Sequence, residues 1–311
     1  GFNWNFSFNA SYVFNKIVKL PDNGNENNRQ GGSQVWDPAT QQVIWVGGYQ
    51  EGHTLGDIYA YQQVKILRDE NEVAQLAGNR IDMIAGLYGP NVSEADRQRY
   101  GLTKPIEAGD VLWADLNGDN VIDQLDRVKV GNIYPKWTGG FSTTLSYKNV
   151  SLYGRFDFAV GHTILNMVAM RSIGQSVGFK NIIADGLDCW TSENPDTDLP
   201  KSYYDDSTNK KNLYRDTAGS DITSVDNRSS RFYEKGDYLA LRELTLSWKL
   251  PEKWVSKIHS TDVSLYITGQ NLFYITGYSG TSPEAPLVYP GVDTGRYPTP
   301  RTVLVGASIS F

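Results

Sequence analysis

The chain has 311 residues, with 29 Lys and Arg against 35 Asp and Glu, for a formal net charge of −6. Its basic residues are scattered, which excludes the electrostatic footprint of a nucleic-acid-binding protein. A single cysteine, Cys189, excludes an intrachain disulfide framework and a zinc site with several Cys ligands. No run of about 18 apolar residues occurs, so no membrane-spanning helix is predicted, whereas a barrel strand needs only about 10 alternating residues.

The first predicted strand runs from Gly1 to Phe14 and alternates between apolar and polar side chains. Its even positions are aromatic or alanine, and its odd positions from residue 3 on are asparagine or serine except for Val13. This period-2 pattern indicates one apolar and one polar face, and the strand exceeds the roughly five or six residues usual in globular proteins. Because neither an initiator Met nor a signal peptide opens the chain, we expect a processed, nicked or truncated piece of a longer protein.

The last predicted strand, 301–311, keeps the same alternation to the final residue. Small and polar residues occupy one face except for Leu304. The other face carries Val303, Val305, Ala307, Ile309 and Phe311. A chain that stops on an aromatic residue, in phase with an amphipathic strand, resembles the C-terminal strand of bacterial outer-membrane proteins.

Five further strands are predicted between the two ends, over 56–67, 137–147, 150–160, 238–250 and 263–273. Within the fourth of them, strict alternation defines an apolar face made of Ala240, Leu244, Leu246 and Trp248. Arg242 shares that phase and breaks the pattern. We expect its guanidinium to reach water from near a strand end.

The connections between these strands differ greatly in length. Lys148-Asn149 is a tight turn, whereas four connections are long: 15–55, 68–136, 161–237 and 274–301. Structureless loops of this length argue against a compact soluble domain and are typical of the outer side of a membrane barrel. An up-and-down count of the strands leaves one crossing unassigned, with 42–48 or 111–114 as candidates.

Residues 115–126 have the spacing of an EF-hand-type calcium loop. Asn120 stands where the motif has Gly, which Asn tolerates because it adopts left-handed angles more readily than most residues. The last ligand is Asp rather than Glu and reaches less far. The predicted ligands, with position 7 using its backbone carbonyl, are Asp115, Asn117, Asp119, Val121, Asp123 and Asp126. We expect a structural Ca²⁺ that stiffens a loop, with a metal-free Asx-rich turn as the alternative.

No enzyme activity is predicted. The three histidines lie far apart, and neither H-E-x-x-H nor G-x-S-x-G occurs. Four aromatic residues within 161–237 could stack on a sugar ring or a peptide side chain, or could instead pack the loop on itself or on a lid: Trp190, Tyr203, Tyr204 and Tyr214.

Several stretches together resemble the C-terminal half of SusC/RagA-type TonB-dependent outer-membrane transporters. They occur in the family's order at 56–61, 115–126, 131–141, 238–246, 269–273 and 297–302, followed by the closing strand. The resemblance implies that 1–311 forms the C-terminal segment, about seven to nine strands, of an antiparallel 22-stranded transmembrane β-barrel. In this arrangement 68–136 is a long connection with the calcium-type loop, and 161–237 is a long extracellular loop.

The same resemblance implies a bacterial outer-membrane importer for oligosaccharides or peptides. Its partners would be the N-terminal plug and barrel portion, which this chain lacks, TonB, outer-membrane lipid and a SusD-like surface lipoprotein. Two alternatives remain open: a secreted all-β calcium-stabilised carbohydrate-binding domain, and a small self-contained outer-membrane barrel. The strand faces discriminate, because a membrane wall needs an outward face without charge.

Overall fold

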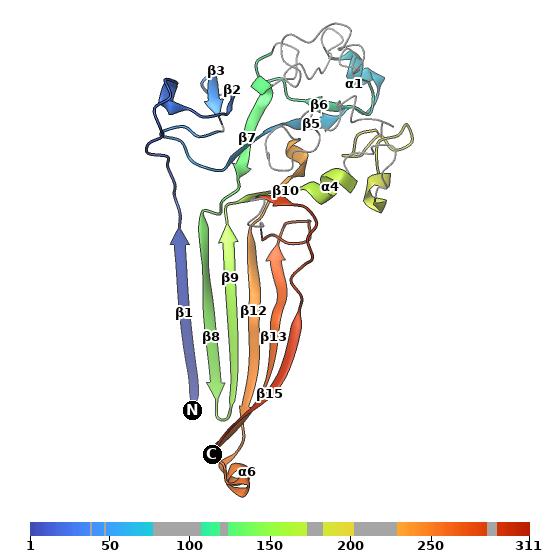
Figure 1. Cartoon of the computed structure of the whole chain (residues 1–311). Coiled ribbons are helices and arrows are strands. Elements are labelled where there is room, and N and C mark those ends of the chain that lie inside the picture. Colours follow the sequence, from blue (N-terminus) through green and yellow to red (C-terminus); the bar gives the residue numbers. More distant parts are fainter. Residues whose placement is uncertain are drawn as a thin grey trace.

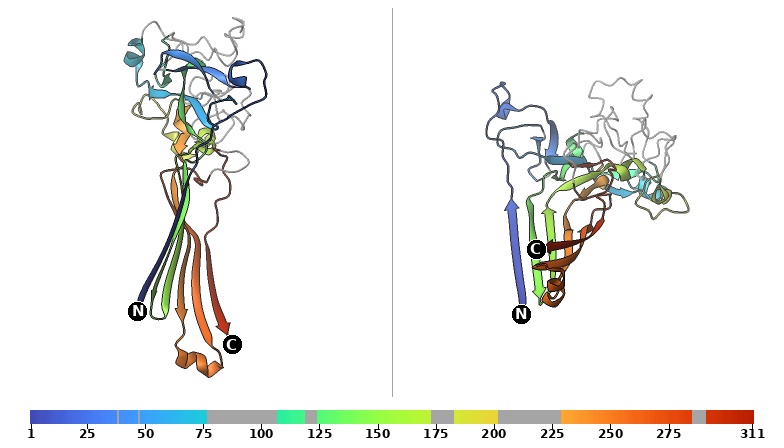
Figure 2. Two further views of the ribbon diagram at one scale, coloured as in Figure 1. Left: turned by 90° about the vertical axis from the view of Figure 1, so that its left-hand side faces the viewer. Right: turned by 60° about the horizontal axis from the view of Figure 1, so that its bottom comes forward.

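Long amphipathic segments pair side by side to form the largest sheet of the protein. The computed structural model describes residues 1–37, 39–46, 48–76, 107–118, 124–172, 183–201, 229–284 and 291–311. Within them, six strands of 9 to 15 residues form an antiparallel wall. Most of the shorter elements gather at one of its ends, and a short helix, α6 (Glu252–Val255), lies at the other (Figure 1). No helix in this described part is long and apolar enough to cross a membrane. Figure 2 shows that the wall is twisted and curved.

The strand order in the wall is β1-β8-β9-β12-β13-β15, and every pairing is antiparallel. The strands are β1 (Phe2–Tyr12), β8 (Trp137–Tyr147), β9 (Val150–Val160), β12 (Tyr238–Lys249), β13 (Asp262–Thr276) and β15 (Thr302–Ser310). The connections β8–β9 and β12–β13 are short and lie at one end. The three long connections lie at the opposite end (Figure 1). Four were predicted, but 15–55 and 68–136 both belong to the single connection between β1 and β8.

The predicted strand at 56–67 is not part of the wall. It is two strands, β4 (Asp57–Tyr61) and β5 (Gln63–Ile66), which pair with β7 (Arg127–Asn132) and β6 (Val111–Trp113). Asp57 explains part of this placement, because it pairs with Lys129 and Asn132 on β7. The prediction of a wall strand here was wrong, and the described wall has six strands instead of seven.

The strand crossing that the sequence left unassigned resulted from counting 56–67 as a wall strand. Residues 42–46 form β3 (Gln42–Val46), which pairs with β2 (Ser33–Asp37), and 111–113 form β6. Neither candidate enters the wall. Six strands already alternate in direction, so removing 56–67 from the count leaves no crossing unassigned.

A β-bulge in β12 changes which residues share a face. Leu241 pairs with Phe156 and Glu243 pairs with Arg155, so Arg242 is an extra residue without a partner in β9. One inserted residue reverses the phase of everything before it. Ala240 therefore pairs with Asp157 on the polar face, and its predicted place beside Leu244 was wrong.

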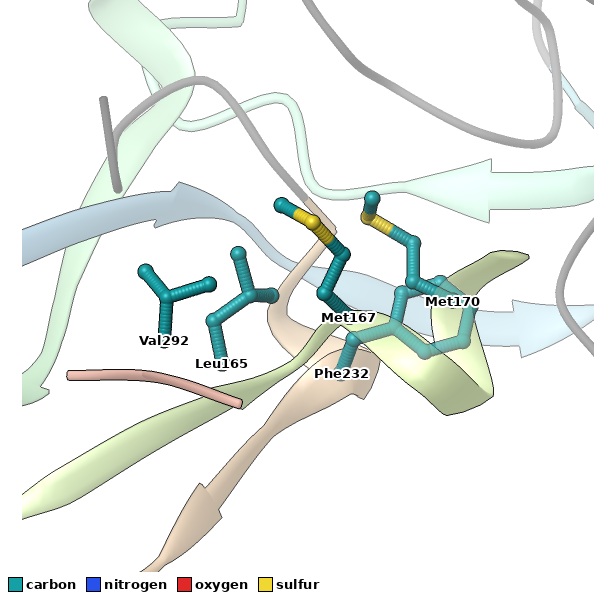
Figure 3. Close-up of a cluster of buried hydrophobic side chains, with 5 residues drawn as sticks. All are labelled: Leu165, Met167, Met170, Phe232 and Val292. Carbon is teal, nitrogen blue, oxygen red and sulfur yellow. The ribbon is translucent and has the colours of Figure 1, made fainter. Parts of the chain in front are cut away.

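The layer at the loop end has a hydrophobic core of its own. Leu165, Met167, Met170, Phe232 and Val292 are each at most 5% exposed and pack together (Figure 3). They come from segments far apart in the sequence. The remaining elements of this layer and of the turn end are β10 (Thr163–Asn166), β11 (Tyr233–Lys235), β14 (Val292–Asp293), α1 (Glu70–Ala74), α4 (Met167–Ser172), α6 (Glu252–Val255), η1 (Glu26–Asn28), η2 (Gln124–Asp126), η3 (Ala184–Leu187), η4 (Ser230–Phe232) and η5 (Ser256–Ile258).

Candidate functional site

One face of the wall is covered with exposed apolar side chains. A row of direct cross-strand partners crosses all six strands: Trp4, Leu145, Leu152, Leu246, Ile267 and Val305. Their exposed fractions run from 37% to 81%. No Asp, Glu, Lys or Arg of the six strands lies on this face, in register with that row. These side chains are adjacent across six strands and form one contiguous apolar surface, and a large contiguous apolar surface marks an interaction site.

Aromatic rings border the apolar face at both ends of the strands. At the loop end, the rings of Tyr12 and Trp137 lie 4.9 Å apart between centroids. At the turn end, Tyr147 and Trp248 flank Val150 in one cross-strand row. Aromatic rings prefer the boundary between hydrocarbon and water, and two such girdles frame the apolar band of outer-membrane barrels. The bulge keeps this face apolar up to the loop end, because it brings Leu241 and Leu239 opposite Phe156 and Phe158.

The opposite face of the wall is polar and carries an ion-paired cluster. Arg242 donates to both Asp157 carboxylate oxygens, with 2.9 Å from Nη2 to Oδ2, and also to Glu284. Its Nη1 lies 3.1 Å from the hydroxyl of Tyr274, which in turn donates to Glu284 over 2.7 Å. The expectation that Arg242 snorkels from the apolar face was wrong, since the bulge turns it to the polar face.

The Arg242 cluster ties a loop to the wall. Glu284 belongs to the connection after β13, whereas Asp157 and Arg242 lie on β9 and β12. Glu284 and Tyr274 were not predicted as members of a site. The available signal was Arg242 itself, since a cation at an apolar position of an otherwise regular strand indicates a bulge as readily as a strand end.

The polar face beside this cluster is hollowed by a recess of about 420 Å³. Its polar lining includes Ser7, Asn9, Ser142, Arg155 and Asp157. The side chain of Arg155 is 57% exposed and lies 3.9 Å from Glu243, a distance that leaves its guanidinium largely available to solvent. A concave surface lined by hydroxyl, amide and solvent-exposed charged groups can bind water and polar solutes.

Side-chain hydrogen bonds, one of them buried, hold the loop layer together above the wall. Glu234 accepts from Asn166 over 2.9 Å and from the backbone N–H of Ser279 over 2.8 Å, which joins the two connections that flank β12 and β13. The Tyr278 hydroxyl donates to Asp293 over 2.8 Å, and both side chains are at most 6% exposed. Burial and the neighbouring Asp293 carboxylate raise the pKa of Tyr278.

Tyr278→Phe is expected to destabilise this layer by about 1–2 kcal/mol, because it leaves a buried carboxylate oxygen of Asp293 with one donor fewer. Since the folded state raises the pKa of Tyr278, the contribution of its hydroxyl is present below the ordinary tyrosine pKa of about 10 and is lost as the pH rises beyond it. Denaturant unfolding of both proteins at pH 7 measures the difference. Equal stability would show that the hydrogen bond contributes nothing.

The ends of the predicted calcium loop meet in the structure. Asp126 is fully buried, and its carboxylate accepts from the backbone N–H of Leu116 over 2.7 Å. Asp115 accepts from Gly118 N–H over 2.8 Å. Asp119, Val121 and Asp123 lie outside the described residues. Among the residues that are described, no group of three or more His, Cys, Asp or Glu is positioned to hold a metal ion.

One of the four aromatic candidates for substrate stacking is described. Trp190 donates from Nε1 to the carbonyl of Arg68 over 3.0 Å, and a Cβ at Gly109 would lie 2.4 Å from its ring. The indole therefore packs on neighbouring loop segments with part of its surface open. The other three, Tyr203, Tyr204 and Tyr214, lie in the part of the chain left undescribed.

The amino-acid sequence is similar to those of TonB-dependent receptors. TonB-dependent receptor P3 of Formosa agariphila is 30% identical over 320 residues, which cover 100% of this chain and 27% of the relative. SusC of Bacteroides thetaiotaomicron, a TonB-dependent receptor, is 24% identical over 321 residues, again 100% of this chain and 24% of the relative. The resemblance to SusC-type TonB-dependent receptors is confirmed. No protein-family model matches the chain.

Two solved structures share the fold of this chain. The RagAB peptide importer in its open-open state matches with a TM-score of 0.59 and 20% identity, over 100% of this chain and 27% of that chain. Its closed-closed state matches with a TM-score of 0.58 and 19% identity over the same shares. The predicted all-β fold, an antiparallel barrel wall that is a fragment of a larger structure, is thus confirmed. The chain spans about a quarter of the length of the relatives that it matches.

Proposed function

We propose that this chain is the C-terminal wall of a TonB-dependent outer-membrane importer for oligosaccharides or peptides. In this role the apolar face contacts outer-membrane lipid, and the polar face lines the interior of a 22-stranded barrel. The observation that carries the proposal is the uncharged apolar face across six strands, with aromatic rings at both of its ends. The similarity to TonB-dependent receptors over the whole chain supports it independently.

The free edges of the wall indicate that further barrel strands pair with it. Among the described strands, β1 and β15 each pair on one side only. Unpaired backbone groups cannot be satisfied in lipid, so the wall needs further strands to close. We infer that an N-terminal plug-and-barrel portion supplies them, that TonB energises transport through that portion, and that a SusD-like lipoprotein covers the loop layer. The chain's role is then to form wall and loops, without catalysis.

The two alternatives fit the observations less well. A secreted carbohydrate-binding domain would expose the apolar face to water at a large cost in free energy. A small self-contained barrel would have to join β1 to β15, and the wall is matched to a fragment of much longer relatives.

Purification from detergent-extracted outer membranes tests the proposal. The chain is pulled down, and every polypeptide that accompanies it is identified by mass spectrometry. We expect the plug-bearing portion of the barrel and a surface lipoprotein. Recovery of this chain alone, as a monomer that is soluble without detergent, would contradict the importer and favour the secreted domain.

We also propose that 115–126 binds one structural Ca²⁺. The proposal is supported by the ligand spacing and by the hydrogen bond that brings Leu116 to Asp126. A metal bound only by the folded state raises its stability, so excess chelator is expected to lower the melting temperature of the assembled protein and added Ca²⁺ to restore it.

The variant for this test is Asp115→Asn, which removes one carboxylate charge and keeps the side-chain shape. Asp69→Asn, at the N-terminus of α1 and outside the loop, is the matched control. We expect the Ca²⁺-dependent shift in melting temperature to shrink in Asp115→Asn and to remain in Asp69→Asn. A melting temperature that is insensitive to chelator and Ca²⁺ in the unmodified protein would leave 115–126 as a metal-free turn.

A further inference from the structure

The short connection between β12 and β13 carries an exposed tryptophan on a helical turn. α6 and η5 follow each other over residues 252–258 at the turn end of the wall (Figure 1). Trp254 is 53% exposed and Ile258 is 52% exposed. Contact with lipid or with another protein would remove this apolar surface from water, which is favourable.

The side chains of the helical turn fall into three groups: one buried and apolar, one exposed and apolar, and one exposed and cationic. Val255 is 4% exposed and faces the protein, where α6 packs against β13 and Val263 is equally buried. Trp254 and Ile258, four residues apart, present apolar surface outward. Lys253 and Lys257, also four residues apart, are exposed. Such a combination is typical of segments that lie in the interface of a membrane, with apolar groups toward the acyl chains and cations toward the headgroups.

A contact between two tryptophan rings places Trp254 on the apolar side of the wall. Its ring stands edge-on to that of Trp248, with centroids 6.0 Å apart. Trp248 belongs to the apolar face, in the cross-strand row with Val150 and Leu265. The apolar residues of β12 extend from Leu239 to Trp248, which corresponds to a band of roughly 25 Å for a tilted strand, close to the height of the lipid-facing band of outer-membrane barrels. Trp254 therefore lies just beyond the edge of this band.

We propose that residues 252–258 form an interfacial anchor that inserts Trp254 and Ile258 among the phospholipids of the inner leaflet. This inference rests on the proposed function, since it takes the apolar face to be lipid-facing and the short turns to be periplasmic. The anchor continues the apolar face past the end of the strands. Lys253 and Lys257 lie where phosphate groups of the same leaflet attract them.

Fluorescence quenching by brominated lipids tests the anchor. The assembled transporter is placed in nanodiscs of phosphatidylethanolamine and phosphatidylglycerol, in a Cys189→Ser background. A bimane label is attached at Ile258→Cys, which keeps Trp254 in place. Leu246→Cys serves as the control in the middle of the apolar face, and Glu252→Cys as the control on the exposed start of the turn.

The expected result is loss of fluorescence at 258 with bromines near the headgroups, loss at 246 with bromines deep in the acyl chains, and none at 252. Adding Trp254→Ala is expected to reduce the quenching at 258. Quenching at 246 without quenching at 258 would overturn the anchor and leave the importer standing. Absence of quenching at both positions would overturn the lipid-facing wall itself, and the anchor with it.

Discussion

Leu246→Arg is expected to destabilise the folded protein in a membrane by about 2–4 kcal/mol. Leu246 lies in the middle of the apolar face, between Leu152 on β9 and Ile267 on β13, and is 47% exposed on the side that we assign to lipid. A guanidinium near the midplane of the hydrocarbon is poorly solvated, which accounts for a penalty of this size. The free energy of unfolding of the assembled protein in phospholipid vesicles measures it.

Ser247→Arg is the matched control for this substitution. Ser247 is the next residue of β12, pairs with Ser151, and lies on the polar face. The same new charge would there meet water in the interior of the barrel. We expect a change within about 0.5 kcal/mol, the usual size for a polar surface substitution. Equal effects of the two variants would contradict the assignment of the faces.

Arg242→Met is expected to cost about 1–3 kcal/mol, the second-largest effect. The side chain of Arg242 is 17% exposed, and its removal leaves the carboxylates of Asp157 and Glu284 close together without their cation. Both carboxylates are 36% exposed, so solvent screens part of their repulsion and the cost stays below that of a fully buried pair. Because Glu284 lies in the connection after β13, proteolysis of that connection is expected to speed up as well.

Arg155→Met provides the comparison for Arg242. Arg155 lies on the same face, but its side chain is 57% exposed and stands 3.9 Å from Glu243. An exposed pair of this kind contributes little, so we expect a change of at most about 0.5 kcal/mol and unchanged proteolysis. If Arg155→Met cost as much as Arg242→Met, the loop would not be held by the Arg242 cluster in particular.

The long strands could be predicted because the alternation of apolar and polar side chains alone identifies each of them. In β1 and β15 every second side chain is apolar, and no charge interrupts the pattern. In a wall one sheet thick, each face has one environment, so alternation in the sequence maps directly onto space. The hairpin at Lys148-Asn149 followed from the same pattern, since its two arms keep their register over their whole length.

The features that the alternating pattern could not predict depend on contacts between residues far apart in the sequence. The bulge at Arg242 is a single extra residue, and the sequence of β12 alone does not distinguish it from a charged side chain near a strand end. Residues 57–66 have strand composition, but their partners are β7 and β6, which lie about 50 to 70 residues further along the chain. Similarly, the ion pair between Arg242 and Glu284 requires the connection after β13 to fold back over the wall.

Cysteine accessibility along β12 tests the central claim most directly. Single cysteines at 243 to 247, in a Cys189→Ser background of the assembled protein in nanodiscs, are exposed to a water-soluble maleimide. We expect reaction at Glu243→Cys, Thr245→Cys and Ser247→Cys, and protection at Leu244→Cys and Leu246→Cys. Reaction at 244 and 246 as fast as at their neighbours would mean that water reaches both faces, and would contradict a membrane wall.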